Sequence, residues 1–378
     1  MLYLDFEKEN HSMKRDKKTE QINLRVTKEE KERIKYLSKK SKQSSLSKYI
    51  INRSLNLEND DNLSFKRINT LTINPWILCR LNIKELNNNI NYDTNDLNIE
   101  IMGSGIIASK IIKKFNLQTL TMHYSGGFTG KYLIDNLINE NIEQIQYESE
   151  KNSRVNLDVF YDINKKISFA GEPSKINAIS KQFILKKIRT FSSNDMFLIT
   201  GDFHKDDEDF IYEMSKVANK NGVKLIFDLN KNFNNILLKF NPIIIKLKYI
   251  DLLNYYSNFK LIDDLSNKDN FEKFKKILLE LREKGAQNIL ITFDSKRSML
   301  YDSDSNFFTA FIDYEFKDKS YQGSDDVFIG AYVSNFLINS YEAFLYANAT
   351  KMASISKEGI PSIDEINIMK KNVKIKKH

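Results

Sequence analysis

From about residue 67 onward, short apolar segments typical of buried strands alternate with longer amphipathic segments typical of helices. The helix-like segments include 104–116 and 206–221. This alternation predicts a parallel β-sheet with helices on both faces. In such a sheet, ligands bind beyond the carboxyl ends of the strands. The clearest strand-like segments are "RINTLTIN" (67–74), "QTLTMHY" (118–124), "DMFLITG" (195–201) and "VKLIFDL" (223–229).

Two segments break this alternation, at 78–86 ("LCRLNIKEL") and 154–162 ("RVNLDVFYD"). Both read as strands outside the main series. They predict a small side sheet, which we interpret as a lid.

Length and composition narrow the class of protein. A chain of 378 residues usually holds one large domain and a smaller module. The single cysteine, Cys79, excludes a disulfide framework and a multi-cysteine zinc site, and four scattered histidines give no reason to expect a metal site. No apolar run is long enough to cross a membrane, and the N-terminus lacks a signal core. We therefore expect a cytoplasmic protein without a membrane partner.

The net charge of +8 is concentrated near the N-terminus. Residues 13–55 contain 14 Lys or Arg against 5 Asp or Glu, so this segment carries +9 and the remainder carries −1. A basic segment joined to a nearly neutral remainder predicts that the segment binds a polyanion.

The pattern of the basic segment is one strand followed by two short helices. In "QINLRV" (21–26), polar and apolar residues alternate. Thr27 and Glu30 then have the spacing of a capping box, and Ser45 can cap a second helix. About 35 residues bury too little surface to be stable alone, so pairing of two strands in a dimer is expected.

This pattern resembles the ribbon-helix-helix family of DNA-binding proteins, over residues 20–56. The resemblance implies that paired strands enter the major groove, with Gln21, Asn23 and Arg25 reading bases. The amides near Ser45 would bind a phosphate. A module used only for dimerisation or for a protein partner is the alternative. Residues 1–19 are expected to be a disordered leader and residues 57–66 a linker.

The region 67–375 resembles the ribokinase/phosphofructokinase-B family, especially the branch of 1-phosphofructokinase and tagatose-6-phosphate kinase. The resemblance implies a ribokinase-like parallel sheet flanked by helices, with a small β lid that can form a dimer. It also implies binding of ATP with Mg²⁺ and of a sugar phosphate. It is carried by "TINP", "GSG", "GGFTGKYL", "SRVN", "ITGD", "GVKLIFD", "IKLKYIDLL", "GAQNILITFDSKRSMLY" and "GSDDVFIGAYV", in the order of the family.

The last of these stretches aligns with the family's catalytic turn, Gly-Ala-Gly-Asp. The resemblance makes Asp326 the base that activates the substrate hydroxyl, and makes Gly323, Ser324 and Asp325 the anion hole. Asp325 takes the place of the second glycine. An aspartate there adds bulk, and a like charge about 4 Å from a developing anion costs on the order of 4 kcal/mol. Aspartate is also a common helix cap, so Asp326 has a purely structural alternative.

Some of the positions that bind the sugar in the family carry different residues in this chain. Where the family has an aspartate, a lysine and an asparagine, this chain has Leu78, Ser104 and Ile107. The nucleotide region departs as well, at Leu247 and Asp294. The residues assigned to substrate binding are Asn74, Gly103, Gly105, Gly126, Gly127, Arg154 and Asn156. Those assigned to nucleotide binding are Lys246, which is retained, together with Lys248 and Thr292. Arg154 suits the existing phosphate of the sugar, although a solvent-facing lid residue is its alternative.

Three functions follow from this mixture. The first is an active ATP-dependent sugar-phosphate kinase with Asp326 as base. The second is a DNA-binding regulator that senses a sugar phosphate and has weak or lost phosphotransfer. The third is a DNA-binding protein whose large domain has lost all ligands. The altered positions 78, 104, 107 and 325 favour the second over the first, and the retained residues favour it over the third.

Overall fold

The computed structural model describes residues 67–86, 97–161, 165–229, 232–255, 268–316 and 321–378, together with Lys31, Ile34, Lys35 and Leu46, which are helical. The chain divides into two units, Met1–Asp61 and Asn62–His378. The division falls inside the segment 57–66 that the sequence predicts to be a linker. The predicted leader and the DNA-reading residues Gln21, Asn23, Arg25 and Ser45 lie outside the described residues.

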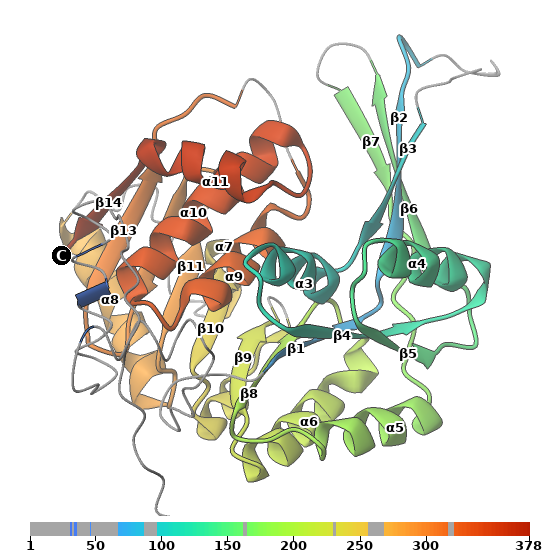
Figure 1. Ribbon diagram of the computed structural model, residues 1–378, viewed down its shortest axis with the longest axis horizontal. Helices are drawn as coiled ribbons and strands as arrows, with labels where there is room; N and C mark the ends of the chain where they lie inside the picture. Colours follow the sequence, from blue (N-terminus) through green and yellow to red (C-terminus); the bar gives the residue numbers. More distant parts are fainter. Residues whose placement is uncertain are drawn as a thin grey trace, which may run out of the picture. The chain divides into compact units, whose positions relative to one another are not determined.

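The large unit is built around a ten-stranded sheet of order β14-β13-β12-β11-β10-β9-β8-β1-β4-β5 (Figure 1). The strands from β5 to β11 in this order run parallel, as the sequence predicts. Their bounds are β1 (Arg67–Ile73), β4 (Thr119–Ser125), β5 (Gln144–Glu148), β8 (Asp195–Thr200), β9 (Lys224–Asp228), β10 (Ile244–Lys248) and β11 (Ile289–Thr292).

The end of the sheet departs from the purely parallel prediction. The strands β12 (Arg297–Tyr301), β13 (Phe307–Ile312) and β14 (Val373–Lys377) are antiparallel. The connections before and after β12 are only a few residues long. Such connections make hairpins, because a parallel crossover needs a dozen residues or more.

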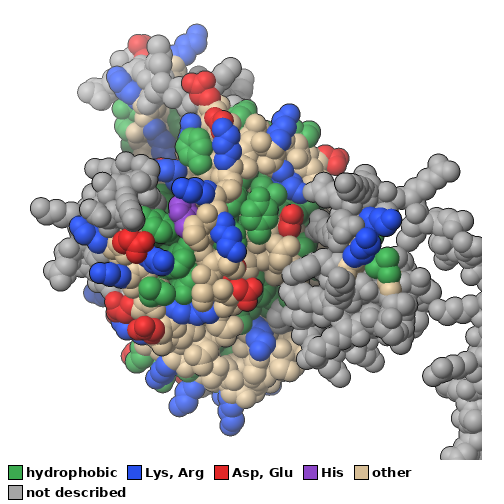
Figure 2. Space-filling model, turned by 90° about the vertical axis from the view of Figure 1, so that its left-hand side faces the viewer, with side chains coloured by type: hydrophobic (Ala, Val, Ile, Leu, Met, Phe, Trp, Pro, Cys, Tyr) green, Lys and Arg blue, Asp and Glu red, His purple; other side chains and the backbone are tan. Residues whose placement is uncertain are grey.

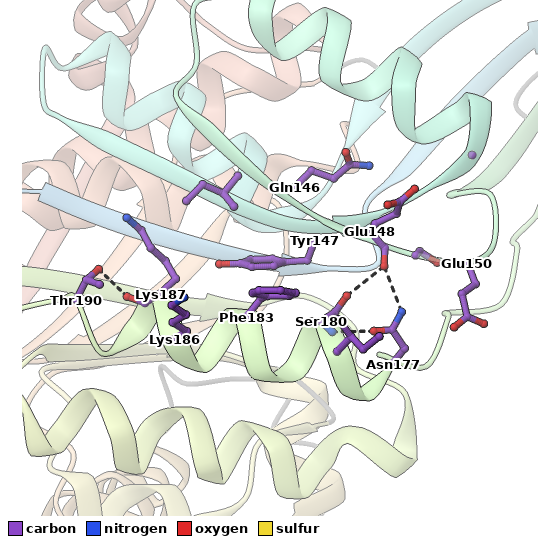
Figure 3. A pocket seen from close by; sticks show the side chains of 14 residues that line it. Gln146, Tyr147, Glu148, Glu150, Asn177, Ser180, Phe183, Lys186, Lys187 and Thr190 are labelled. Carbon is purple, nitrogen blue, oxygen red and sulfur yellow. Dashed lines mark hydrogen bonds between the residues drawn. The ribbon is translucent and has the colours of Figure 1, made fainter.

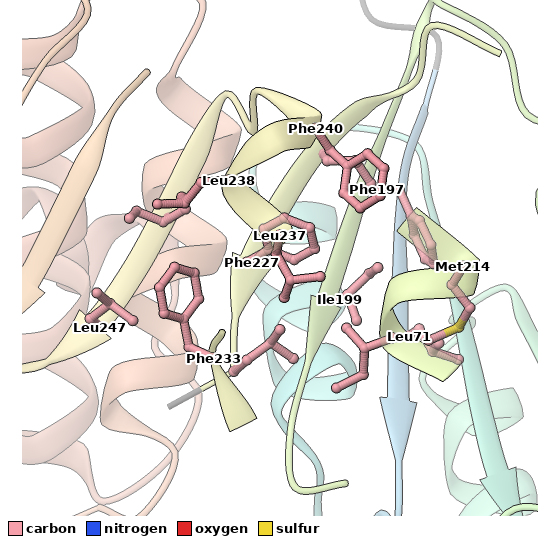
Figure 4. Packing of buried hydrophobic residues seen from close by; sticks show 14 of the residues in the cluster. Leu71, Phe197, Ile199, Met214, Phe227, Phe233, Leu237, Leu238, Phe240 and Leu247 are labelled. Atoms are coloured by element: carbon pink, nitrogen blue, oxygen red, sulfur yellow. The ribbon is translucent and has the colours of Figure 1, made fainter. Parts of the chain in front are cut away.

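Helices cover both faces of the sheet, which gives three layers (Figure 1). One face packs against α5 (Ala178–Ile188), α6 (Glu208–Lys220) and α8 (Lys268–Glu283). Figure 4 shows part of this core, where Leu71, Phe197 and Ile199 of the sheet lie close to Met214 of α6 and Phe227 lies next to Leu237. The burial of these apolar side chains is the main stabilising contribution to the fold.

The other face packs against α3 (Ser104–Lys114), α9 (Ser324–Asn335) and α10 (Ser340–Lys357). On this face the strands are apolar at their starts and polar at their carboxyl ends, as in the pairs Ile226 and Asp228 of β9 or Leu290 and Thr292 of β11. Because side chains alternate along a strand, both members of such a pair point to the same face. The polar ends therefore gather beside the start of α9. The remaining helices are α4 (Gly127–Asn139), α7 (Tyr249–Tyr255) and α11 (Ile363–Met369), with short 3-10 turns η1 (Lys205–Asp207), η3 (Asn235–Phe240) and η4 (Lys370–Asn372).

A second sheet, of order β3-β2-β6-β7, projects from the main body (Figure 1) and corresponds to the predicted lid. One face is polar, with Arg80, Asp158 and Lys166, whereas the other carries exposed apolar side chains such as Ile99 and Phe169. The strand bounds are β2 (Trp76–Asn82), β3 (Leu97–Met102), β6 (Arg154–Tyr161) and β7 (Lys165–Phe169).

Candidate functional site

The turn that opens α9 is tightly packed around Gly323. A Cβ atom on Gly323 would lie 2.7 Å from Ile107 Cδ1 and 2.8 Å from the ring of Tyr321. Glycine is therefore required for space, since its φ of −81° is open to any residue. The backbone N–H of Ser324 donates to the carbonyl of Tyr321 at 3.0 Å, and that of Asp326 donates to the carbonyl of Gly323 at 3.0 Å. Two of the amides at this helix start are thus engaged within the turn.

Asp325 is surrounded by cations from two other elements. Its carboxylate accepts a hydrogen bond from Lys351 Nζ of α10 at 2.9 Å, and Lys248 Nζ of β10 lies 3.8 Å away. The Thr292 hydroxyl lies at 3.5 Å. Burial opposes ionisation, but the charges of Lys351, Lys246 and Lys248 hold the pKa of Asp325 well below its usual range. The carboxylate is therefore charged and neutralised within the site.

Lys351 was not identified from the sequence. Its side chain is 4% exposed, and it also donates to the carbonyl of Asp294 at 2.7 Å. The available signal was a lone lysine in the small-residue and apolar stretch "YANATKMASI" of an otherwise buried helix. A buried lysine needs an anionic partner, and Asp325 supplies it.

Asp326 has the opposite electrostatic environment. Burial, and then the charge of Asp228, raise its pKa to about 7, against the opposing effects of Lys246 and of a hydrogen bond from Ser104. A carboxyl group that titrates near neutral pH is suited to accept a proton from a hydroxyl. Adjacent aspartates in one turn thus differ in charge state because one is paired with lysines and the other faces a second carboxylate.

Lys246 and Asp228 form a buried ion pair at the carboxyl ends of β10 and β9. Lys246 Nζ lies 2.9 Å from Asp228 Oδ1, and both side chains are at most 2% exposed. Burial opposes the charge of Lys246, but Asp228 and Asp325 raise its pKa, so it remains a cation. Lys246 therefore acts on the site through its charge while remaining out of contact with solvent.

A cavity of about 350 Å³ lies beside this turn. It brings together four residues predicted from the sequence, two from the anion hole and two from the nucleotide group: Ser324, Asp325, Lys248 and Thr292. Lys351 and Asp294 also line it, whereas Lys246 does not. The polar lining consists of two lysines, four hydroxyl side chains and the carboxylates of Asp294 and Asp325. The lysines and hydroxyls suit phosphate oxygens, whereas the carboxylates oppose them.

The predicted substrate residues of the lid make contacts within the protein. Arg154 lies over the ring of Trp76 at 4.7 Å and donates to Asp202 at 3.3 Å. Its Nε is buried and, among the described residues, has no hydrogen-bond partner. Asn156 accepts from the N–H of Gly171 at 3.0 Å. These contacts hold the first half of β6 against the loop that follows β7.

Asn74 also connects loops. Its Oδ1 accepts from the N–H of Ser174 at 2.6 Å, and its Nδ2 donates to the carbonyl of Asp202 at 3.3 Å. It has a φ of 64°, which asparagine tolerates better than most residues. Asn74 thus fixes the loops around the lid, whether or not it also contacts a ligand.

The glycine turns at the starts of α3 and α4 allow close approach of the backbone. A Cβ on Gly105 would lie 2.6 Å from Thr72 Oγ1, and one on Gly126 would lie 2.0 Å from the carbonyl of Ser149. At Gly127, Asn152 Oδ1 occupies the position of a Cβ and accepts from the N–H of Phe128 at 3.1 Å. The start of α4 is therefore capped by a side chain of the chain itself, while Gly103 closes the corresponding turn of α3 at a φ of 152°.

Two of the three altered sugar positions are part of the core. Leu78 and Ile107 are at most 1% exposed and pack with Met102, Tyr321 and Val327. Apolar packing thus fills the space next to Asp326 on the side where the family carries polar sugar contacts.

A hydrogen bond that the sequence did not predict links the lid to the α9 turn. Gln322 Nε2 donates to Asp158 Oδ2 of β6 at 2.7 Å. Asp158 is 3% exposed and also accepts from Lys166 at 3.0 Å and from Ser168 at 2.7 Å. Gln322 directly precedes Gly323, so this hydrogen bond connects the lid to the start of α9.

A larger cavity, of about 980 Å³, lies between β5 and α5 (Figure 3). Tyr147 and Phe183 lie next to each other along it, with Lys186 and Lys187 at one end and Glu148 at the other. Gly127 is its only lining residue among those predicted from the sequence. The paired aspartates and lysines described above do not line this larger cavity.

Two further findings concern the described part of the chain. It contains no group of three or more His, Cys, Asp or Glu side chains that could hold a metal ion. None of its helices is long and apolar enough to cross a membrane.

Comparison with known proteins gives a family-model match near the N-terminus that extends into β1. Residues 16–72 match the NikA-like family model, described as mobilization protein NikA, which is a ribbon-helix-helix DNA-binding module. The predicted module, 20–56, lies inside this match.

The relatives of the rest of the chain are sugar-phosphate kinases. The chain is 26% identical to D-tagatose-1-phosphate kinase of Bacillus licheniformis over 226 residues, which cover 60% of this chain and 71% of that protein. It is also 26% identical to 1-phosphofructokinase of Borreliella burgdorferi over 255 residues, covering 65% and 77%.

Solved structures confirm the ribokinase-like fold. Phosphofructokinase-2 from Escherichia coli, in complex with substrates and products, matches with a TM-score of 0.71 and 18% identity. The match covers 81% of this chain and 98% of that chain. The homologues are therefore of the 1-phosphofructokinase and tagatose kinase family, the structural neighbours share the ribokinase-like fold, and the N-terminal segment matches a ribbon-helix-helix DNA-binding module.

Proposed function

We propose that this chain, which joins a DNA-binding module to a sugar-phosphate kinase fold, is a DNA-binding regulator that responds to a sugar phosphate and has weak or lost phosphotransfer. The observation that carries the proposal is the contact between Asp325 and Lys351 at 2.9 Å. It places a permanent carboxylate among the groups that would otherwise bind a transferring phosphate.

The Asp325–Lys351 contact gives a different reason why Asp325 would oppose catalysis than the one inferred from the sequence. The sequence suggested repulsion of a developing anion, but Lys351 and Lys248 offset much of that charge. The obstacle is instead competition, because two cations are already paired with an internal anion. A phosphate must displace Asp325 from Lys351, a buried cation, before it can use that lysine.

Binding of a sugar phosphate is supported by the lid. Among the described residues, the buried Nε of Arg154 has no hydrogen-bond partner, and the other hydrogen bonds of the guanidinium, at 3.3 Å and 3.4 Å, are long. An arginine in this state retains capacity for a phosphate. Asn156 and the glycine turns at Gly126 and Gly127 would complete the substrate side.

If the chain retains kinase activity, its cofactor would be ATP with Mg²⁺. Lys248, Thr292 and Lys351 would face its phosphates, and the bound metal would offset their charge. Asp325 is a poor candidate for a metal ligand while it is paired with lysines. The fit of the nucleotide is therefore partial, which supports weak phosphotransfer.

Binding of DNA would depend on the N-terminal module. Gln21, Asn23 and Arg25 would read bases, and the amides near Ser45 would hold a phosphate. Ribbon formation needs two chains, and the outer face of the lid provides apolar surface for the same dimer, with Leu97, Ile99, Val155 and Phe169 each at least 42% exposed. A ligand that moves the lid would then alter the geometry of the dimer and so of the ribbon.

An active kinase is the second candidate, and Asp326 favours it. A pKa of about 7 suits a general base, and the charged Lys246 is retained beside it. In this reading, Asp326 takes the proton of the sugar hydroxyl as the phosphate is transferred.

The regulator proposal is tested by measuring DNA affinity with and without ligand. A library of duplexes selected with the full-length protein provides the site, and fluorescence anisotropy gives its affinity at fixed salt. A change of at least threefold on adding fructose 1-phosphate supports a sensing regulator. If the affinity for the duplex is the same with and without sugar phosphates and ATP, the regulator proposal is wrong.

A further inference from the structure

The antiparallel end of the main sheet carries a row of residues that the α9 site does not use. Arg297 of β12 is directly opposite Phe311 of β13, which is directly opposite Lys374 of β14. Directly opposite residues project to the same face, so an aromatic ring lies between two cations. One step along the strands, Thr309 and Lys376 form the next pair on that face.

Phe311 is unusual among the aromatic residues of this region. Its side chain is 46% exposed, whereas Phe307 and Tyr301, on the same face and nearer to α8, are buried and stacked on each other. Phe311 therefore contributes little to the core. Figure 2 shows the side of the molecule that carries β13, β14 and α8, with Lys and Arg side chains spread among exposed hydrophobic ones.

Each cation of the row has an acidic neighbour at the surface. Arg297 contacts Asp294 at 2.7 Å, and Lys374 contacts Asp313 at 2.5 Å. All four side chains are at least 40% exposed, and exposed pairs of this kind contribute little to stability. A phosphate can therefore replace the carboxylates, and the exposed Lys376 adds further positive charge to this face.

Lysines on an edge strand have a structural explanation, because they prevent pairing with another sheet edge. That explanation does not account for an exposed phenylalanine between two cations on the face of the sheet. A ring flanked by cations is the arrangement by which sheets bind single-stranded nucleic acid, with bases stacked on the ring and phosphates on the cations.

We propose that the sheet face formed by Arg297, Phe311, Lys374 and Lys376 binds single-stranded DNA. A base stacks on Phe311, and the flanking phosphates contact Arg297, Lys374 and Lys376. Stacking accepts any base, so this contact is independent of sequence, unlike the base reading assigned to the N-terminal module. The proposal does not depend on the sensing function proposed above.

The test uses the full-length protein and a fluorescent oligothymidylate, with anisotropy measured at several salt concentrations. Phe311→Ala is expected to weaken binding at least tenfold, and Phe311→Leu, which keeps apolar area but removes the ring, is expected to weaken it similarly. Lys374→Gln with Lys376→Gln should lower the slope of log K against log salt by about 1.4, since each lost single-strand contact removes about 0.7.

Matched controls come from α5. Phe183 is 55% exposed, and Lys186 is exposed on the same helix. Phe183→Ala and Lys186→Gln should leave oligothymidylate binding unchanged. Thermal melting of each variant verifies that the fold is retained, which is expected because Phe311 is largely outside the core.

Arg25→Ala separates the sheet face from the N-terminal module. It should reduce duplex binding and leave oligothymidylate binding intact. Loss of oligothymidylate binding in Arg25→Ala, or wild-type binding by both Phe311 variants, would overturn the proposal for the sheet face. Absence of duplex binding by the wild-type protein would overturn the regulator proposal. The oligothymidylate measurements would still test single-strand binding by the sheet face.

Discussion

The ammonium of Lys351 lies 2.9 Å from the carboxylate of Asp325, and the lysine side chain is 4% exposed. Lys351 belongs to α10 and Asp325 to the first turn of α9, so the contact connects these two helices beside the cavity. Each residue explains the other: the lysine would be costly to bury alone, and the aspartate would be unfavourable beside Asp326 without a cation.

The first prediction concerns Asp325→Gly. Removing the carboxylate frees Lys351 and Lys248 for phosphate and removes side-chain bulk from the turn. Binding of ATP–Mg²⁺ is expected to tighten about tenfold, which is about 1.4 kcal/mol, and phosphotransfer is expected to rise. Calorimetry and an ADP-release assay measure the two effects.

Asp325→Asn is the matched control, because it removes the charge and keeps the bulk. Lower ATP affinity or lower activity in Asp325→Gly than in the wild type would mean that Asp325 has a positive role in the reaction.

The second prediction concerns Lys351→Met. This change leaves Asp325 without its closest cation, and breaking a buried pair in this way costs about 3 kcal/mol. Because the pKa of Asp325 is depressed in the folded state, the pair stabilises the protein above the unfolded-state pKa, and this stabilisation is lost as the pH falls. Urea denaturation at several pH values measures it. The double variant Lys351→Met/Asp325→Asn should regain part of the loss, and equal stability of the wild type and Lys351→Met would refute the account of the pair.

The third prediction concerns the pH dependence caused by Asp326. Its pKa is raised to about 7 in the folded protein, so the folded state holds a proton that the unfolded state releases near pH 4. The contribution of this group to stability therefore falls as the pH rises from about 4 to about 7. Any phosphotransfer should rise over the upper part of that range, as the base loses its proton.

Asp326→Asn should remove both trends, and the stability curve of this variant should be flatter than that of the wild type between pH 4 and 7. Superimposable curves would show that Asp326 does not titrate in that range.

The fourth prediction concerns Arg154→Ala. Loss of the guanidinium should weaken binding of fructose 1-phosphate at least tenfold, because a charge-assisted contact to the sugar's phosphate disappears. Arg154→Lys should be intermediate, since lysine lacks the planar pair of donors. Calorimetry measures the affinity, and Lys166→Ala, on the same face of the lid, is a control for general loss of positive charge. Unchanged affinity in Arg154→Ala would place the phosphate elsewhere.

The fifth prediction concerns Asp158→Asn. Asp158 joins the lid to Gln322 and also holds Lys166 and Ser168. Removing its charge should weaken these contacts and increase hydrogen exchange in β6 and β7. Asp313→Asn, an exposed acidic residue with one lysine partner, is the control. Exchange that remains unchanged in the lid would exclude this link as the connection between lid and turn.

Much of the fold could be predicted because the alternation of strand and helix is local and is repeated along the chain. The antiparallel end was missed because Arg297 and Phe307 begin strands after connections whose length matters more than their composition. The lid was predicted because the segments 78–86 and 154–162 read as strands that break the alternation of strand and helix.

The site was harder to predict than the fold. The turn at Gly323, Ser324, Asp325 and Asp326 could be found because it is contiguous in sequence. Lys351 and Asp158 could not, because each contacts the turn from more than 25 residues away, and a lone lysine or aspartate carries no local pattern. The charge of Asp325 was therefore judged without its cation, and the expected repulsion was too large.

The most direct test of the account is a calorimetric titration of the purified protein with fructose 1-phosphate and with ATP–Mg²⁺, each followed by a coupled ADP-release assay. The account predicts that the sugar phosphate binds and that ADP release is absent or slow in the wild type and rises in Asp325→Gly. Rapid ADP release by the wild-type protein would establish an active kinase and contradict the proposal that Asp325 closes the site.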